Sequence, residues 1–133
     1  MNNYKETILV VEDDMQIRNF ICYALKNEGY NSKTATTGAQ ARNTVASETV
    51  DLIILDLGLP DIDGMDVISK VRQWSEIPII VVSARDQDNE KAYALDMGAD
   101  DYITKPFSST ELLARIRVAI RHMNRRDTTK KQS

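Results

Sequence analysis

The stretch Ile8-Leu9-Val10-Val11-Glu12-Asp13-Asp14 joins a run of apolar residues directly to three carboxylates. The apolar run is continuous rather than alternating, which favours a strand buried on both faces of a parallel sheet. Similar runs end directly before Asp56 and before Ser83, and two less apolar segments also have strand character. The five predicted strands cover residues 8–11, 31–36, 52–55, 77–82 and 101–104.

Helical spacing separates these strands. After the first strand, apolar residues recur at intervals of three and four, which places them on one face of a helix, and Gly29 follows as its expected C-cap. The members of this face are Ile17, Phe20, Ile21, Ala24 and Leu25. Further helices are predicted at residues 38–47, 65–71, 88–97 and 109–120, the last behind a capping-box pattern of Ser108 and Glu111. The alternation predicts an α/β fold with helices on both faces of a parallel sheet.

Bulk composition narrows the class of protein. The chain has 133 residues, 42% hydrophobic and 28% charged, which suits one globular domain. Its net charge of −3 gives the domain no overall electrostatic footprint for nucleic acid. Cys22 is the only cysteine, and no apolar run approaches the length of a membrane span. We therefore expect a cytoplasmic protein without a membrane partner.

Basic and polar residues dominate the sequence after Ile120. Arg and Lys alternate there with Asn, Thr, Gln and Ser, which indicates a solvated helix end that runs into a linker. We expect a folded domain at residues 1–122, a linker at residues 123–133, and a natural chain that continues beyond it.

Side chains that carry chemistry follow the predicted strands. Glu12 and Asp13 come after the first strand, Asp56 after the third, Ser83 at the end of the fourth and Lys105 after the fifth. Doubly wound sheets bind ligands at the carboxyl ends of their strands, and one such sheet has the strand order 2-1-3-4-5. Clustered carboxylates repel one another and usually serve a cation.

Helix capping is the competing explanation for an aspartate behind a strand. We prefer it for Asp14 and Asp63, each of which precedes a predicted helix. Asp56 is followed by Leu-Gly-Leu-Pro rather than by a helix start, so capping does not account for it. The coincidence of Asp56 with the other strand-end groups favours a functional site.

Four motifs in this order resemble the signatures of receiver domains in bacterial two-component response regulators. The resemblance covers about residues 6–122 and implies a (βα)5 flavodoxin-like sheet of order 2-1-3-4-5. The segment 98–107 and the predicted last helix are similar to the OmpR/PhoB subfamily, and residues 56–61 and 72–75 look most like regulators of Kdp-type potassium transport. The four motifs are Val10-Val11-Glu12-Asp13, Asp56-Leu-Gly-Leu-Pro60, Val82-Ser83-Ala84 and Gly98-Ala-Asp-Asp-Tyr-Ile-Thr-Lys-Pro-Phe107.

The resemblance implies a role for each site residue. Asp56 would accept the phosphoryl group, and Mg²⁺ would be bound by Asp13 directly, by Glu12 through water and by the Gly58 carbonyl. The groups that would hold phosphoryl oxygens are the side chains of Ser83 and Lys105 and the backbone N–H groups of Leu57 and Ala84. Ser83 and Tyr102 would move together as the switch. Ser83 stands where Thr is commoner, and it keeps the hydroxyl.

The resemblance also implies partners. A sensor histidine kinase would supply the phosphoryl group, and activation would promote a homodimer. A winged-helix DNA-binding domain absent from this chain would then regulate transcription. The residues that would form the dimer interface are Lys91, Ala92, Leu95, Asp101, Glu111, Leu113 and Arg115.

Two alternatives compete with this interpretation. One is a receiver that acts alone, without a DNA-binding domain. The other is an enzyme, a phosphohydrolase with an aspartate nucleophile. Such enzymes commonly carry an acid two residues after the nucleophile, where this chain has Gly58, and a cap for which the chain has no room. We therefore expect no turnover of an external substrate.

Overall fold

The computed structural model describes the backbone of residues 6–84 and 88–132, and the side chains of residues 6–84 and 88–125. Five parallel strands form one sheet in the order β2-β1-β3-β4-β5. The strands are β1 (Thr7–Val11), β2 (Asn31–Ala35), β3 (Leu52–Asp56), β4 (Ile79–Ser83) and β5 (Asp101–Thr104). The helices are α1 (Met15–Asn27), α2 (Gly38–Ser47), α3 (Gly64–Arg72), α4 (Asp88–Met97) and α5 (Ser109–Gln132). The predicted alternation and the strand order implied by the resemblance are both confirmed.

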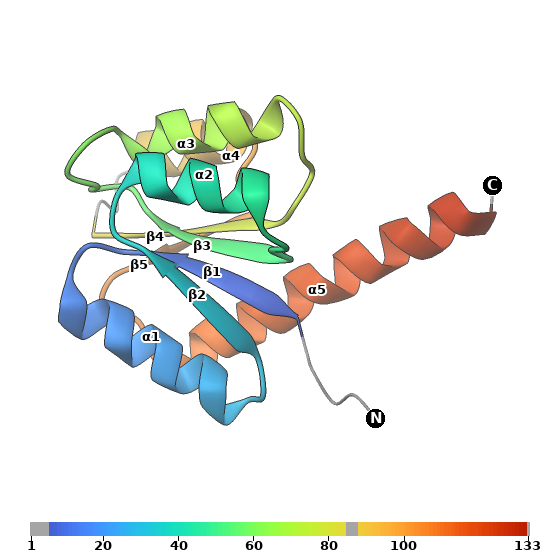
Figure 1. Cartoon of the computed structure of the whole chain (residues 1–133), viewed down its shortest axis with the longest axis horizontal. Helices are drawn as coiled ribbons and strands as arrows, with labels where there is room; N and C mark the ends of the chain where they lie inside the picture. The colour runs from blue at the N-terminus through green and yellow to red at the C-terminus, as the bar shows by residue number, and fades with distance from the viewer. Residues whose placement is uncertain (1–5, 85–87, 133) are drawn as a thin grey trace.

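Helices cover both faces of the sheet. In Figure 1, α1 and α5 lie on one face, and α2, α3 and α4 lie on the other. Residues of β1 and β3 alternate between the two layers: Ile8 and Val10 pack toward α1 and α5, whereas Leu9 and Val11 pack toward the opposite helices. Both β3 and β4 are buried along their whole length, which explains their continuous apolar sequences.

The N-terminus of α1 is capped as predicted, and its C-terminus is shifted by one residue from the prediction. Asp14 caps the N-terminus, because its carboxylate accepts a hydrogen bond from Ile17 N at 3.1 Å. At the other end Glu28 is the C-cap, and Gly29 follows it with a φ of 86°. The glycine we expected as the C-cap therefore stands one residue later, where the left-handed backbone favours it.

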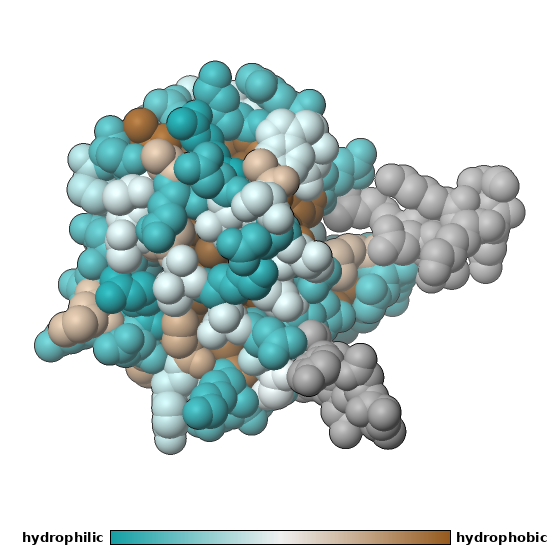
Figure 2. Space-filling model, in the orientation of Figure 1, coloured by the Kyte–Doolittle hydropathy of each residue, from teal (hydrophilic) through white to brown (hydrophobic). Residues whose placement is uncertain are grey.

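The surface is largely hydrophilic on the face drawn in Figure 2, where hydrophobic residues form only scattered patches. No helix within the described residues is long and apolar enough to cross a bilayer. The helix α5 continues to Gln132 and projects away from the sheet (Figure 1). Residues 123–132, which we expected to form a linker, therefore have helical backbone, and their connection to a further domain stays a prediction.

Candidate functional site

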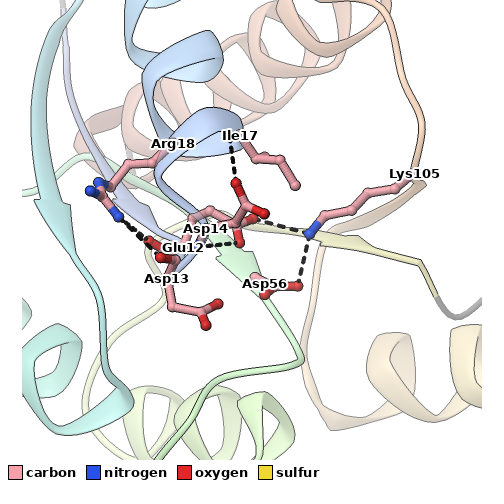
Figure 3. A network of polar contacts seen from close by, with 7 residues as sticks. All are labelled: Glu12, Asp13, Asp14, Ile17, Arg18, Asp56 and Lys105. Carbon is pink, nitrogen blue, oxygen red and sulfur yellow. Dashed lines mark hydrogen bonds and ion pairs between the residues drawn. The ribbon is translucent and has the colours of Figure 1, made fainter.

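The site forms where strands end together. Strand register pairs Val11 with Leu55, Asp56 with Val82, and Ser83 with Thr104, so the segments that follow these strands share one edge. Glu12 follows β1, and Lys105 follows β5. The chain turns directly from Glu12 into α1, and Asp14 is engaged in capping that helix, so Glu12 and Asp13 are left to face the site. Figure 3 shows this arrangement.

Three carboxylates converge at this edge. One oxygen each from Glu12, Asp13 and Asp56 can be chosen so that all three lie within 4.8 Å of one another. Glu12 and Asp56 are buried, whereas Asp13 is exposed and opens the cluster to solvent. Hard divalent cations prefer oxygen ligands of this kind. The cluster can therefore hold a metal ion.

Lys105 supplies positive charge beside the carboxylates. Its Nζ lies 3.1 Å from Glu12 Oε1 and 3.3 Å from Asp56 Oδ1 (Figure 3). Burial alone lowers the pKa of Lys105, but the neighbouring charges of Asp56 and Glu12 outweigh burial and raise the pKa above its ordinary value. Lys105 is therefore a fixed cation at neutral pH, next to the carboxylate that we expect to react.

Glu12 is buried with an incomplete set of partners. Its Oε2 accepts a hydrogen bond from Asp14 N at 3.2 Å. Within the described part of the chain, no donor reaches Oε1 with hydrogen-bonding geometry, although Lys105 pairs with it by charge. Burial raises the pKa of Glu12, the charge of Asp56 raises it further, and Lys105 opposes both. A buried carboxylate oxygen that has a charge partner but no well-formed hydrogen bond fits a site that receives a cation or its bound water.

The remaining predicted site residues lie at the same edge. Ser83 is buried at the end of β4, and Ala84 follows it on the surface. Leu57 is buried and Gly58 is exposed, directly after Asp56. A methyl group at Gly58 would lie 3.8 Å from Asp56 Oδ2, so the backbone there passes close to the Asp56 carboxylate.

Tyr102 and the predicted dimer residues belong to α4, β5 and α5. Tyr102 is half-buried on β5 and packs against the core on the side of α2, α3 and α4. On the neighbouring surface, Arg115 NH1 lies 3.2 Å from Asp101, and Arg115 NH2 lies 3.5 Å from Glu111. Ala92 and Leu95 of α4 are exposed, whereas Lys91 and Leu113 are half-buried.

Arg18 is a site neighbour that our sequence analysis missed. Its guanidinium donates to the backbone carbonyls of Glu12 at 3.1 Å and Asp13 at 3.4 Å. It thereby holds the segment that carries both carboxylates (Figure 3). The available signal was its position one turn after the N-cap Asp14, from which a long side chain can reach back over the preceding segment.

Comparison with known proteins gives consistent matches. KdpE of Escherichia coli strain K12, a KDP operon transcriptional regulatory protein, is 50% identical over 114 residues, which are 86% of this chain and 51% of that protein. Response regulator ArlR of Staphylococcus aureus strain Mu50 is 43% identical over 120 residues, 90% of this chain and 55% of that protein. This chain therefore spans about half the length of these regulators.

A solved structure supports the same assignment. The BeF3-activated N-terminal receiver domain of Klebsiella pneumoniae RstA superposes with a TM-score of 0.83 at 34% identity, covering 86% of this chain and 98% of that one. Residues 8–117 match the family described as the response regulator receiver domain. The resemblance carried by the four sequence motifs is confirmed, and this chain belongs to the response regulator receiver domain family.

Proposed function

We propose that Asp56 accepts a phosphoryl group from a sensor histidine kinase and that Mg²⁺ assists the transfer. The observation that carries the proposal is the convergence of Glu12, Asp13 and Asp56 beside Lys105. An oxygen of Asp56 forms the new bond to phosphorus while the bond from phosphorus to the histidine nitrogen breaks, and the electron pair leaves with the nitrogen.

The charges of the site explain why Asp56 can react. A carboxylate must approach a phosphoryl group that is already anionic, so fixed positive charge is required. Lys105 contributes one such charge, 3.3 Å from Asp56. Asp13, Glu12 through water and the Gly58 carbonyl would hold Mg²⁺, which would supply positive charge to the phosphoryl oxygens. Ser83 and the N–H groups of Leu57 and Ala84 are proposed to hold those oxygens.

An apolar pocket beside the site offers a place for the phosphoryl donor. It has a volume of about 480 Å³ and lies between α1 and the segment after β5. Phe20 is 45% exposed there, and its ring centroid lies 6.0 Å from that of Phe107. Exposed aromatic side chains are typical of protein interfaces. The residues that line the pocket are Gln16, Ile17, Phe20, Ala84, Lys105, Pro106 and Phe107.

The acceptor chemistry is tested with a small phosphoryl donor. Acetyl phosphate and Mg²⁺ are expected to add one phosphoryl group to the wild-type chain, as measured by intact mass, and removal of the divalent cation is expected to prevent it. Addition of the phosphoryl group at full rate in excess EDTA would contradict the metal-assisted site. Sustained hydrolysis of small phosphate esters would instead favour the phosphohydrolase, whose acid position is occupied by Gly58.

We propose that the output of this phosphorylation is transcriptional, in the cytoplasm. The KdpE relative is named as a regulator of the KDP operon, and this chain spans about half of it. A DNA-binding domain after residue 133, connected through residues 123–133, and potassium-transport genes as targets fit that relationship. Both regulators described above are about twice as long as this chain, so neither supports the alternative of a receiver that acts alone.

Activation is proposed to join two copies through α4, β5 and α5. Arg115 pairs with Asp101 and Glu111 inside one chain, and each exposed pair contributes only about 0–1 kcal/mol. A two-fold interface would form each pair between the chains twice, in place of the pairs inside one chain, and would cover the exposed side chain of Leu95, which is 45% accessible. The pairs proposed to form across the interface are Lys91 with Glu111 and Asp101 with Arg115.

Sedimentation with beryllofluoride is expected to show this dimer. Arg115→Glu is expected to weaken it by several-fold, because the substitution puts like charges against Asp101. Arg117→Glu is the matched control, since Arg117 lies on the same helix but near Glu28 of α1, at 3.9 Å. A wild-type chain that stays monomeric with beryllofluoride, or equal weakening by both variants, would contradict this interface.

A further inference from the structure

The loop between β3 and α3, residues 57–63, carries two backbone groups of the proposed site. Leu57 contributes an N–H group and Gly58 a carbonyl. The base of the loop is closed, because Gly64 N donates to Leu57 O at 3.1 Å. A Cβ at Gly64 would lie 2.7 Å from Leu57 Cα, so the two ends of the loop touch. The base of the loop is therefore held by its own backbone.

The tip of the loop is held by a different element. The carboxylate of Asp61 accepts hydrogen bonds from Gly38 N at 2.8 Å and from Ala39 N at 3.0 Å. These are the first two N–H groups of α2, which have no partner within the helix. The two bonds lower the pKa of Asp61, Gly38 contributing most, so the carboxylate is charged at neutral pH.

Packing reinforces this junction. A Cβ at Gly38 would overlap the side chain of Ile62, so the loop lies directly against the start of α2. Thr37 caps the same helix end from within, because its hydroxyl accepts from Gln40 N at 3.1 Å. The start of α2 thus has one local cap and one cap supplied by a loop 22 residues away.

Asp61 does not belong to the metal cluster. Among the described residues, the carboxylates that converge are Glu12, Asp13 and Asp56. Both oxygens of Asp61 are engaged at α2, and Asp63 is engaged at Met65 N of α3, at 3.0 Å. The loop that follows Asp56 is therefore tied to two helices by two aspartates.

We propose that Asp61 is a positioning residue for the phosphorylation site: by binding the loop to the N-terminus of α2, it fixes Leu57 and Gly58 beside Asp56. The inference rests on the proposed function, since it concerns groups that would face Mg²⁺ and the phosphoryl oxygens. Some residues do not touch the metal but hydrogen-bond to its ligands and orient them. Mutation of such a residue commonly lowers metal affinity or activity by about 10- to 100-fold. Asp61 acts in this way through the backbone.

Asp61→Ala and Thr37→Ala form a matched pair. Both remove a side-chain cap from α2, but only the first releases the loop. Initial rates of modification by acetyl phosphate are measured against Mg²⁺ concentration. Asp61→Ala is expected to raise the half-maximal Mg²⁺ concentration roughly tenfold, while Thr37→Ala keeps the wild-type value. Asp61→Asn, which retains one acceptor oxygen, is expected to fall between them and covers the case in which the alanine variant does not fold.

Hydrogen exchange of the metal-free protein gives a readout independent of phosphorylation. The Gly64 amide, whose bond to Leu57 O closes the loop, is expected to lose protection in Asp61→Ala and to keep it in Thr37→Ala. Wild-type Mg²⁺ dependence in both Asp61 variants, or equal shifts in Asp61→Ala and Thr37→Ala, would overturn the inference. A wild-type chain that is not modified at Asp56 would instead overturn the proposed function.

Discussion

Asp56→Asn is expected to stay unmodified under conditions in which the wild-type chain gains one phosphoryl group. The amide has nearly the shape of the carboxylate but lacks the charge and basicity needed to form an acyl phosphate. Asp56 is buried and faces Lys105 at 3.3 Å, whereas Asp13 is exposed. Glu12 is also buried beside Lys105, at 3.1 Å, but it follows β1 rather than ending β3 and is expected to serve the metal ion, so we expect the loss to be complete.

Asp63→Asn is the matched control for this experiment. It makes the same chemical change seven residues away, in the segment that follows Asp56. Asn remains a good N-cap, so α3 should keep its first turn, and modification should proceed as in the wild type. Intact mass and peptide mapping measure both variants. Stoichiometric, persistent modification of Asp56→Asn would mean that another residue is the acceptor.

Local sequence patterns were sufficient for the elements and for the chemistry at their ends. The continuous apolar runs predicted the buried strands because β3 and β4 are buried on both faces. Asp14 and Asp63 were correctly predicted as caps, because a cap acts within about three residues of itself. The alternation of strands and helices placed Asp56 and Lys105 at the same edge, although they are 49 residues apart.

Contacts between segments far apart in the sequence could not be predicted from local sequence patterns. Asp61 caps α2 from 22 residues away, and nothing in its neighbourhood marks it as different from any other loop aspartate. The surroundings of Glu12 Oε1, which pairs with Lys105 by charge, likewise depend on how β1, β3 and β5 come together. The strand order could not be predicted from local patterns either, because many strand orders are compatible with the same alternation of strands and helices. The family resemblance supplied that order.

The metal-free protein is expected to be destabilised by its own carboxylates. Oxygens of Glu12, Asp13 and Asp56 lie within 4.8 Å of one another. Two unit charges about 5 Å apart repel by about 3 kcal/mol at an effective dielectric constant near 20. Lys105 offsets much of this for the buried pair of Glu12 and Asp56, which leaves roughly 1 kcal/mol.

Removal of one negative charge should therefore raise the melting temperature without metal. Asp13→Asn is the simpler case, because Lys105 pairs with Glu12 and Asp56 and the substitution leaves both ion pairs in place. Asp56→Asn is also expected to raise the melting temperature, since Glu12 keeps its ion pair. A gain of about 1 kcal/mol corresponds to about 4 °C for a domain of this size.

The pH dependence follows from Glu12. Its pKa is raised by burial first and by Asp56 second, so the folded chain retains this proton to higher pH than the unfolded chain does. Between the ordinary and the raised pKa, the folded state binds more protons, and the free energy of unfolding falls as pH rises. The penalty is absent well below the ordinary pKa of glutamate, about 4.3, and is complete once the pH exceeds the raised pKa of Glu12. The advantage of Asp56→Asn should shrink accordingly in acid.

Mg²⁺ is expected to reverse the order of stability. At a concentration about 100-fold above its Kd, a ligand of the folded state stabilises it by about 2.7 kcal/mol. The wild type should gain this amount, and Asp13→Asn and Asp56→Asn much less. Asp14→Asn makes the same charge change at the adjacent residue and keeps the cap of α1, so it should respond to Mg²⁺ as the wild type does. Thermal unfolding with and without Mg²⁺ measures all four proteins. Metal-free melting of both cluster variants below the wild type, together with equal Mg²⁺ shifts in every protein, would show that these carboxylates do not share a cation.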